Sequence, residues 1–431
     1  MQRGARAIVS HMKGFIIYAF RLMWMTMTFE EKYLKLIGQI DNFVQMNAGT
    51  SIVDSYFGPA NLSPKRVEPC LTVDELIENI DTLYGQTKGL ENELRRIVIA
   101  SELESLRVVV RWLSGEIIPY SRLVKGIFGI TPCKFKEREI RRAQKKVEEA
   151  SASLPGSSIS EKILRWMKNG EVSGKVLKEL VETELAELTR KIEKLFDQHV
   201  FTYFPTGVQN KGVIYKTVTK KPWGANNYYQ GNYTSITAIN IDLPANRRRI
   251  MGGLCHEYEH HVTNLFREKH YRENKLLDLS AVLYHTKGSV IDEGTADCAK
   301  DFLNLQTEEE HSELLEYLQN LRRMIDINVA YMINVQGVDD ETAAEYIASE
   351  SFAPIEAARK LLEFIKPMTP NGKPNFFKPY IYTYFFGRRD YVLPTFQEAQ
   401  KKNRLKEFFQ ILYLNPYSRS TASWKIAFAK I

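Results

Sequence analysis

The sequence predicts a mainly α-helical protein, in which a large helical body carries a small β-sheet next to one central helix. Two observations support this fold class. Over most of the chain, apolar residues recur at helical spacing behind capping signatures. Between about residues 201 and 244 the period changes, and aromatic, β-branched, Gly and Pro residues indicate short strands. A chain of 431 residues, 44% hydrophobic and 26% charged, has the composition of a globular protein with a large core.

Residues 1–27 are expected to be a non-structural N-terminal extension. The apolar run 14–20 follows basic residues as in a signal peptide, but Arg21 interrupts it and no small-residue cleavage site follows. The run is also too short to cross a bilayer. The four cysteines form no pattern typical of a disulfide framework, which favours a reducing compartment. We therefore expect a cytoplasmic chain that begins near Thr28 and has no membrane segment.

A helical N-terminal region is expected over residues 28–200. Capping boxes at Thr28 and Thr72 open two of its helices. An apolar stripe over 177–195 at i, i+3, i+4 spacing indicates core packing. The expected helices cover residues 28–47, 90–112 and 135–150. Another starts at residue 72, and one more carries the apolar stripe 177–195.

Residues 201–431 are expected to form the catalytic region, within one integrated body. A strand over 234–241 precedes a helix that begins between Ala245 and Arg248 and ends near Lys269. If that strand has an exposed edge, it can bind an extended peptide by main-chain hydrogen bonds, and an ordinary strand of a small sheet is the equal alternative. Further helices are expected after a capping box at 307–310, over 312–335, from 339, over 356–365, and as a last pair after a Pro/Gly loop at 366–379.

The segment 256–261, His-Glu-Tyr-Glu-His-His, is the most specific chemical signal, because it holds three of the eight histidines. Positions i and i+4 share one helix face, so His256 and His260 can converge on one metal ion, as in the His-Glu-x-x-His helix of zinc peptidases. The same residues match the reversed His-x-x-Glu-His pattern. Glu257 and Glu259 lie about 80° to either side of the two histidines, so the helix alone leaves the choice of base open.

A catalytic zinc site needs a third protein ligand, and Glu293 is the best candidate. Asp297 follows it by one helical turn and can accept a hydrogen bond from a ligand imidazole. The small residues 294–296 would let this helix pack closely against the histidine helix. His261 points about 100° away from His260, so it is expected to orient or pack rather than to bind. The remaining alternatives as ligands are Glu259, His285 and Asp292.

The motif with its downstream glutamate and aspartate resembles the gluzincin metallopeptidases, the group that includes thermolysin. A largely uncharacterised family of helical gluzincin-like proteins is more similar still. Its members share, in the same order, the segments 53–59, 128–132, 240–244, 292–294 and 384–388. That family has Pro-Gly before its final two histidines, whereas this chain has the compact HEYEHH, whose helical geometry favours His260 over His261 as second ligand.

The resemblance implies a zinc ion held by His256, His260 and Glu293, with Glu257 as general base. It also implies that Tyr384 corresponds to the tyrosine that stabilises the transition state in helical zinc peptidases such as angiotensin-converting enzyme. Tyr380 and Tyr382 lie in the same run, and all three could equally be aromatic core residues.

These residues together predict a zinc-dependent peptidase of the carboxypeptidase or oligopeptidase kind. Glu257 would take a proton from the zinc-activated water, and Tyr384 or His285 would donate to the oxyanion. Arg388 or Arg389 could bind a substrate carboxylate, although surface charge explains either. The alternative is a non-hydrolytic metal- or peptide-binding protein that keeps the fold.

No nucleic-acid partner is expected. The chain has 59 basic and 52 acidic residues, a small excess of positive charge for its length. The basic clusters at 134–146 and 247–249 are therefore expected to be solvated helix faces or helix starts.

Overall fold

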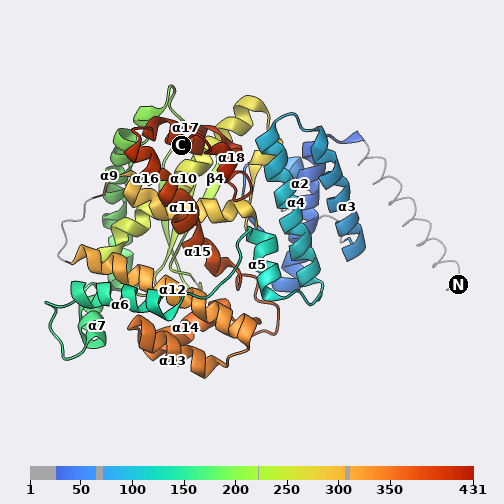
Figure 1. Cartoon of the computed structure of the whole chain (residues 1–431). Coiled ribbons are helices and arrows are strands. Elements are labelled where there is room, and N and C mark those ends of the chain that lie inside the picture. Colours follow the sequence, from blue (N-terminus) through green and yellow to red (C-terminus); the bar gives the residue numbers. More distant parts are fainter. Residues whose placement is uncertain (1–25, 65–70, 222, 306–310) are drawn as a thin grey trace.

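The structure, a computed structural model, describes residues 26–64, 71–221, 223–305 and 311–431, and it confirms the mainly α-helical fold (Figure 1). Nearly all of the expected N-terminal extension, and the capping box expected at 307–310, lie outside the described residues. Among the described residues, no helix is long and apolar enough to cross a membrane.

The N-terminal helices begin where their capping residues predict. Thr28 and Thr72 each accept a hydrogen bond from the backbone of a glutamate three residues on, and each glutamate side chain bonds back. The expected single stripe over 177–195 is instead divided between two helices that meet at Glu184. The helices are α2 (Phe29–Ala48), α3 (Val73–Gln86), α4 (Glu93–Leu113), α5 (Tyr120–Phe128), α6 (Glu137–Ala150), α7 (Ile159–Asn169), α8 (Gly174–Thr183) and α9 (Leu185–His199).

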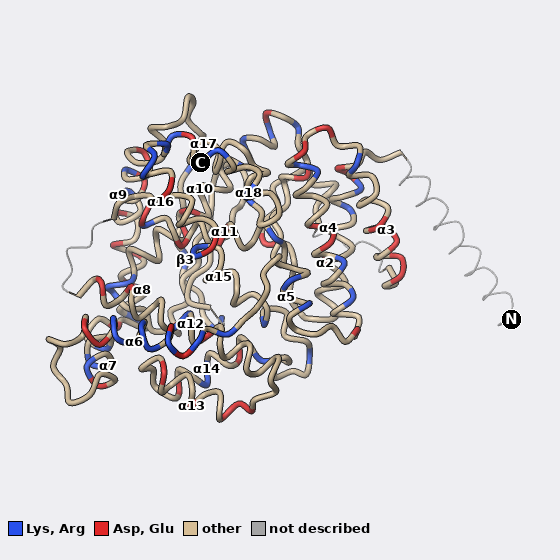
Figure 2. Tube along the Cα trace, in the orientation of Figure 1, with Lys and Arg blue, Asp and Glu red and all other residues tan. Residues whose placement is uncertain are grey.

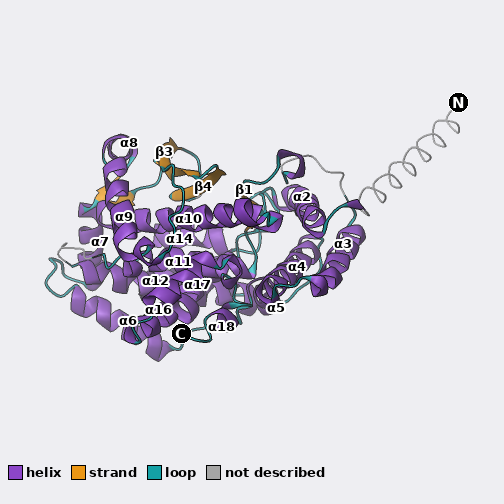
Figure 3. Ribbon diagram, turned by 90° about the horizontal axis from the view of Figure 1, so that it is seen from above, coloured by secondary structure: helices purple, strands orange, loops and turns teal. Residues whose placement is uncertain are grey.

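The largest of three small sheets lies over one side of the histidine helix, α10 (Arg247–Asn274) (Figure 3). Its strands β3 (Val213–Val218), β5 (Thr234–Asn240) and β4 (Ala225–Gly231) follow one another in that order, with β3 parallel and β4 antiparallel to β5. The expected strand is confirmed as β5, but it is the central strand, so the suggestion that its edge is exposed is wrong. The outer strand nearest α10 is β4.

The hairpin of β4 and β5 is anchored to α10 by Glu268. Asn232 and Tyr233 both have positive φ, as a tight hairpin turn requires. Their backbone N–H groups each donate to the Glu268 carboxylate at 2.9 Å, and the Tyr229 hydroxyl donates to it at 2.6 Å. The buried carboxylate also accepts a hydrogen bond from Arg272 of α10 at 2.7 Å, and the three bonds from the hairpin fix the position of β4 along the helix.

Two further pairs of strands tie distant segments together. β1 (Val53–Tyr56) pairs antiparallel with β7 (Ala281–Leu283), and β2 (Glu171–Val172) pairs antiparallel with β6 (Ala245–Asn246). Both pairs bring N-terminal segments next to the ends of α10, so the first 200 residues help to position the candidate site.

The C-terminal part is helical again, with one irregular stretch. The expected last pair of helices is instead a series of short helices that includes a π-helical segment, Gly387–Val392. The elements are α11 (Lys287–Phe302), α12 (Ser312–Gln336), α13 (Asp340–Ser351), α14 (Ile355–Ile365), α15 (Thr383–Phe386), the π-helical segment, α16 (Leu393–Lys401), α17 (Leu405–Leu414) and α18 (Trp424–Ala427).

The core consists of two large apolar clusters that do not follow the expected boundary at residue 200. One combines helices α2–α7 with α12–α14, and the other combines α8–α10 with α16–α18. Helix α11 lies between them, because its neighbouring residues Val290 and Ile291 pack into different clusters. The two expected regions thus share their core, and α11 runs through the junction.

The basic clusters lie largely on solvated helix faces. Figure 2 shows basic and acidic residues side by side on α6, where Arg141 pairs with Glu137 and Lys145 with Glu149. Only the opposite face of α6, which includes Ile140, is buried. Such neighbouring opposite charges leave α6 no long stretch of one sign.

Candidate metal centre

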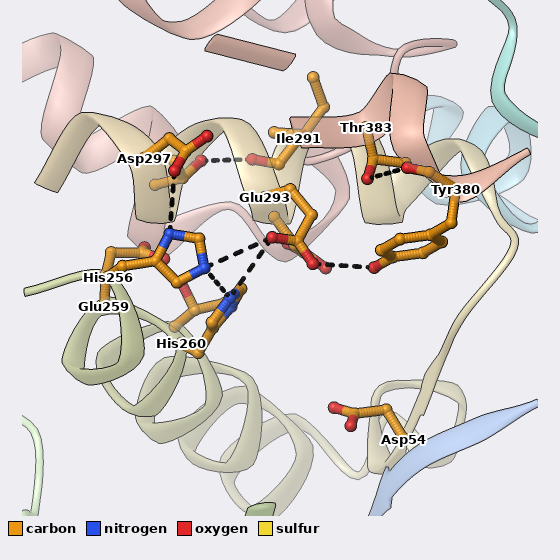
Figure 4. A network of polar contacts seen from close by, with 12 residues as sticks. Asp54, His256, Glu259, His260, Ile291, Glu293, Asp297, Tyr380 and Thr383 are labelled. Carbon is orange, nitrogen blue, oxygen red and sulfur yellow. Dashed lines mark hydrogen bonds and ion pairs between the residues drawn. The ribbon is translucent and has the colours of Figure 1, made fainter. Parts of the chain in front are cut away.

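Helices α10 and α11 bring His256, His260 and Glu293 together (Figure 4). The Nε2 atoms of the two histidines are 3.2 Å apart. The Glu293 Oε2 atom lies 3.5 Å from Nε2 of His256 and 3.8 Å from Nε2 of His260. Zinc bonds of about 2.0–2.1 Å in tetrahedral geometry place ligand atoms about 3.4 Å apart. The three atoms therefore have the spacing of a zinc ligand set.

The Glu293 carboxylate has one oxygen atom that a cation would satisfy. Its Oε1 atom accepts a hydrogen bond from the Tyr380 hydroxyl at 2.9 Å. Its Oε2 atom is buried and, among the described residues, has no hydrogen-bond partner. A buried carboxylate oxygen without a partner is costly, and a cation shared with two imidazoles would remove that cost. Two nitrogens and one carboxylate oxygen suit zinc.

Asp297 holds the ring of His256, as its spacing from Glu293 predicts. Its Oδ1 atom lies 3.1 Å from Nδ1 of His256, and Arg323 contacts both carboxylate oxygens at 2.9 and 2.6 Å. Burial raises the pKa of Asp297, but the charge of Arg323 and the hydrogen bond with His256 outweigh it, so this pKa lies below its usual range. An ionised Asp297 keeps the proton of a neutral His256 on Nδ1 and leaves Nε2 free to bind a metal.

Glu259 cannot serve as the base, because it faces the C-terminal helices. It is fully buried, accepts a hydrogen bond from Thr263 at 2.6 Å, and pairs with Arg419 at 3.6 Å. Arg419 also binds Asp292 at 3.0 Å, and Arg267 binds the same carboxylate at 2.7 Å. Both carboxylates are thus held in a buried ion network, which removes Glu259 and Asp292 from the alternatives.

Glu257 lies on the side of α10 that faces β4. The backbone of Asn227 in β4 is among the groups that lower its pKa. Burial is the main cause that raises the pKa of Glu257. His256 and His260 lower this pKa, and the charge of Glu293 raises it further. A partly exposed carboxylate with a raised pKa, next to the ligand set, has the properties of a general base.

Of the two other histidines of the prediction, His261 packs as expected, whereas His285 does not suit the oxyanion role. His261 bonds Ser235 of β5 at 2.8 Å and Asn210 at 2.9 Å, so it fastens the sheet to α10 and contacts no ligand side chain. His285 is fully buried, stacks on Phe376 and contacts its carbonyl oxygen through Nε2 at 2.6 Å. Burial lowers the pKa of each histidine to about 3. A buried imidazole with that bond is not placed to donate to a substrate, so His285 is unsuited to the oxyanion role.

The tyrosines near the site have separate places. Tyr380 binds Glu293, whereas Tyr384 lines a cavity of about 610 Å³ together with His256 and Asp297. Burial is the main cause that raises the pKa of Tyr384, and the charges of Glu293 and Glu257 raise it further. Its hydroxyl therefore keeps its proton. Tyr384 therefore remains the candidate donor.

Neither predicted carboxylate-binding arginine is free. Arg388 is paired with Asp301 and also donates to the backbone oxygen of Asp297 at 2.9 Å. Arg389 pairs with Asp390 at 2.5 Å and lies over the ring of Phe386. Both guanidinium groups are committed to the protein, so the suggestion that one binds substrate is not supported.

The small residues of α11 have a different neighbour from the one expected. A Cβ atom on Gly294 would lie 2.3 Å from the backbone carbon of Gly387, in the π-helical segment. Gly294 therefore lets α11 approach that segment, rather than α10, at backbone contact. Gly387, the glycine of the Tyr384–Gly387 motif, therefore positions Gly294, which follows Glu293 directly.

Sequence reasoning missed the roles of four residues around this site: Asp54, Asn227, Arg323 and Tyr380. Asp54 on β1 faces the site (Figure 4), and the charge of His260 is among the influences on its pKa, which burial raises. A sequence signal existed for two of them, because Asp54 lies in the shared segment 53–59 and Tyr380 lies in the tyrosine run that includes Tyr384. Asn227 and Arg323 have no local signature, because only the fold brings β4 and α12 to the site.

The sequence matches no known family profile and no curated protein. Two solved structures are similar in fold. One, described as a "putative lipoprotein" from Colwellia psychrerythraea, has 10% identity and a TM-score of 0.48, over 90% of this chain and 68% of that one. The other, described as a "putative lipoprotein of unknown function" from Shewanella oneidensis, has 13% identity and a TM-score of 0.49, over 82% and 72% of the two chains.

Proposed function

We propose that this protein is a zinc-dependent peptidase in which His256, His260 and Glu293 hold the metal. The observation that carries the proposal is the buried Oε2 atom of Glu293, which lacks a hydrogen-bond partner among the described residues and faces two imidazole nitrogens. A zinc ion held there would lower the pKa of a bound water toward ~7 and polarise a substrate carbonyl.

Glu257 then serves as the proton carrier. Its raised pKa suits it to accept a proton from the attacking water and to deliver that proton to the leaving amine nitrogen. Tyr384, whose hydroxyl remains protonated, donates a hydrogen bond to the oxygen that gains negative charge.

Strand β4 supplies a surface for an extended substrate. It is an outer strand of its sheet, and the residue that contacts Glu257 is part of it. A peptide that adds to such an edge makes main-chain hydrogen bonds and passes close to the base.

The substitution Glu257→Gln tests the proposal, with His260→Ala as the matched ligand variant. We expect Glu257→Gln to bind one zinc per chain, measured by elemental analysis, while hydrolysis of a peptide library falls by at least about 10³-fold. His260→Ala should lose both the metal and the activity. Unchanged hydrolysis by Glu257→Gln contradicts the assignment of the base. Stoichiometric zinc without any turnover by the unmodified protein would point to the non-hydrolytic binding protein instead.

A further inference from the structure

Three cavities beside the metal centre share one residue, Arg249, in the first turn of α10. One cavity of about 280 Å³ reaches Glu257, and a second of about 610 Å³ reaches His256. A third, of about 250 Å³, is lined by Arg322 and Arg323. Gly253, one turn after Arg249, lines both of the first two. Arg249 therefore stands where the space around the base and the space around the ligands meet.

In the part of the chain that the structure describes, no carboxylate pairs with Arg249. Its neighbours on the helix are committed elsewhere, since Arg247 pairs with Glu184 at 3.2 Å and Arg248 donates to the backbone oxygen of Trp166 at 3.1 Å. Arg249 itself forms no ion pair or hydrogen bond with the residues that the structure describes. Its side chain is exposed to the cavities. An accessible guanidinium without a carboxylate partner is a receptor for an anion.

The other charged groups around Arg249 leave this positive charge in place. Burial, and then the charge of Arg323, lower the pKa of Arg249, but a guanidinium keeps its proton in proteins. Asp297 is already bound by Arg323. Burial raises the pKa of Asp326, which lines the third cavity, to about 7, so this carboxyl is only partly ionised at neutral pH.

The cavity that links Arg249 to Glu257 has apolar walls. A volume of about 280 Å³ is enough for one large apolar side chain, and apolar walls favour such a side chain over a charged one. The walls include Leu177, Leu180, Val181, Leu185, Ile239 and Leu243.

The distance along α10 limits the length of chain that fits. His256 lies seven positions after Arg249 on α10, a rise of about 10 Å. Extended peptide covers about 3.3–3.6 Å per residue. After allowance for the reach of the ion pair, a carboxylate on Arg249 leaves space for one or two residues beyond a bond held at the metal centre.

We propose that this compartment, lined by Arg249, Gly253, Glu257 and the leucine-rich wall, binds the C-terminal residue of a peptide. The terminal carboxylate pairs with Arg249, and an apolar last side chain enters the 280 Å³ cavity. The proposal rests on the proposed function for the reaction, and it makes the protein a carboxypeptidase. Water is added across the last peptide bond: the C–N bond breaks, the hydroxyl goes to the acyl carbon, and a proton goes to the released amine.

Binding can be measured apart from hydrolysis. The probes are dansyl-Ala-Ala-Ala-Leu with a free carboxylate, the same peptide as C-terminal amide, and dansyl-Ala-Ala-Ala-Asp amide. Affinity is measured by fluorescence anisotropy with the Glu257→Gln protein, and release of leucine is measured with the unmodified protein. We expect the free acid to bind at least about tenfold more tightly than either amide.

Two variants and one control assign the effect to Arg249. Arg249→Gln should reduce binding of the free acid to the level of the amide, whereas Arg247→Gln, on the same helix turn but paired with Glu184, should leave it unchanged. Gly253→Leu fills open space between the two larger cavities and should weaken binding of the leucine peptide without loss of the fold, which circular dichroism checks.

The outcomes separate the two proposals. Equal binding of acid and amide, or an Arg249→Gln protein that keeps the preference, overturns the C-terminal site. Preferential binding of the aspartate amide that depends on Arg249 also overturns it, because the carboxylate would then belong to a side chain. Preference for the free acid without hydrolysis supports the site and removes the peptidase proposal. Hydrolysis that is equally fast with and without a free C-terminal carboxylate supports the peptidase proposal and overturns the C-terminal site.

Discussion

The contact between α11 and the π-helical segment can be tested by the substitution Gly387→Ala. A Cβ atom at this position would lie 1.9 Å from the backbone oxygen of Val290 and 2.9 Å from Gly294. Real Cβ contacts are not shorter than 3.0 Å, so α11 and the segment must separate by about 3.0 − 1.9 = 1.1 Å. Both partners are backbone, which no side-chain rotation can relieve.

This separation acts on stability and on the metal site. Overpacking of this kind costs about 1–3 kcal/mol, and we expect about 3 kcal/mol because no flexible side chain can move aside. Glu293 precedes Gly294 directly, so it moves with the helix. A ligand displaced by about 1 Å is far outside the tolerance of about 0.2 Å for a metal bond. Zinc affinity should therefore fall by at least about tenfold.

Urea denaturation followed by circular dichroism measures the first effect, and competition with a chromophoric chelator measures the second. Gly252→Ala is the matched control, because a Cβ atom at this helical position meets nothing within 4 Å. That variant should be more stable by about 0.5–1 kcal/mol. The reasoning is refuted if Gly387→Ala unfolds at the same urea concentration as the unmodified protein and binds zinc equally well.

Three further substitutions test individual side chains. If the proposed zinc site is right, Tyr384→Phe should lower kcat by about 10²-fold at unchanged zinc content, whereas Tyr380→Phe should weaken zinc binding, because Tyr380 donates to the proposed ligand Glu293; activity assays and chelator competition separate the two. Arg419→Met should reduce the free energy of unfolding by about 3–5 kcal/mol, measured with urea, because it leaves the buried Glu259 unpaired. The pKa of His285 falls from 6.5 to about 3 on folding, so stability is lost as pH drops from about 6.5 toward 3, by up to about 1.4 kcal/mol per pH unit. In metal-free His285→Asn protein, the free energy of unfolding in urea should therefore change less with pH between about 6.5 and 3 than in the unmodified protein. An equal pH dependence in the two proteins would contradict the buried, neutral state of His285.

Much of the fold could be predicted from local sequence, since its cause is local. Capping at Thr28 and Thr72 and the apolar periodicity of the helices depend on residues within a few positions of one another. Strand β5 was also found, but its place at the centre of a sheet was not, because strand order depends on partners that lie elsewhere in the chain. The shared core of α2–α7 and α12–α14 was beyond sequence reasoning for the same reason.

For the candidate site, the sequence alone determined which functional groups are present: two imidazoles one helical turn apart on α10, a carboxylate beside them, and the Glu293–Asp297 pair on α11. Helical periodicity fixes these relations before folding. The tertiary structure removed Glu259 from the choice of base, because Arg419, which lies on another element, holds it in a buried ion pair. It likewise separated Tyr380 from Tyr384 and left Arg249 without an ion-pair partner among the described residues, since packing rather than sequence spacing determines which charges meet.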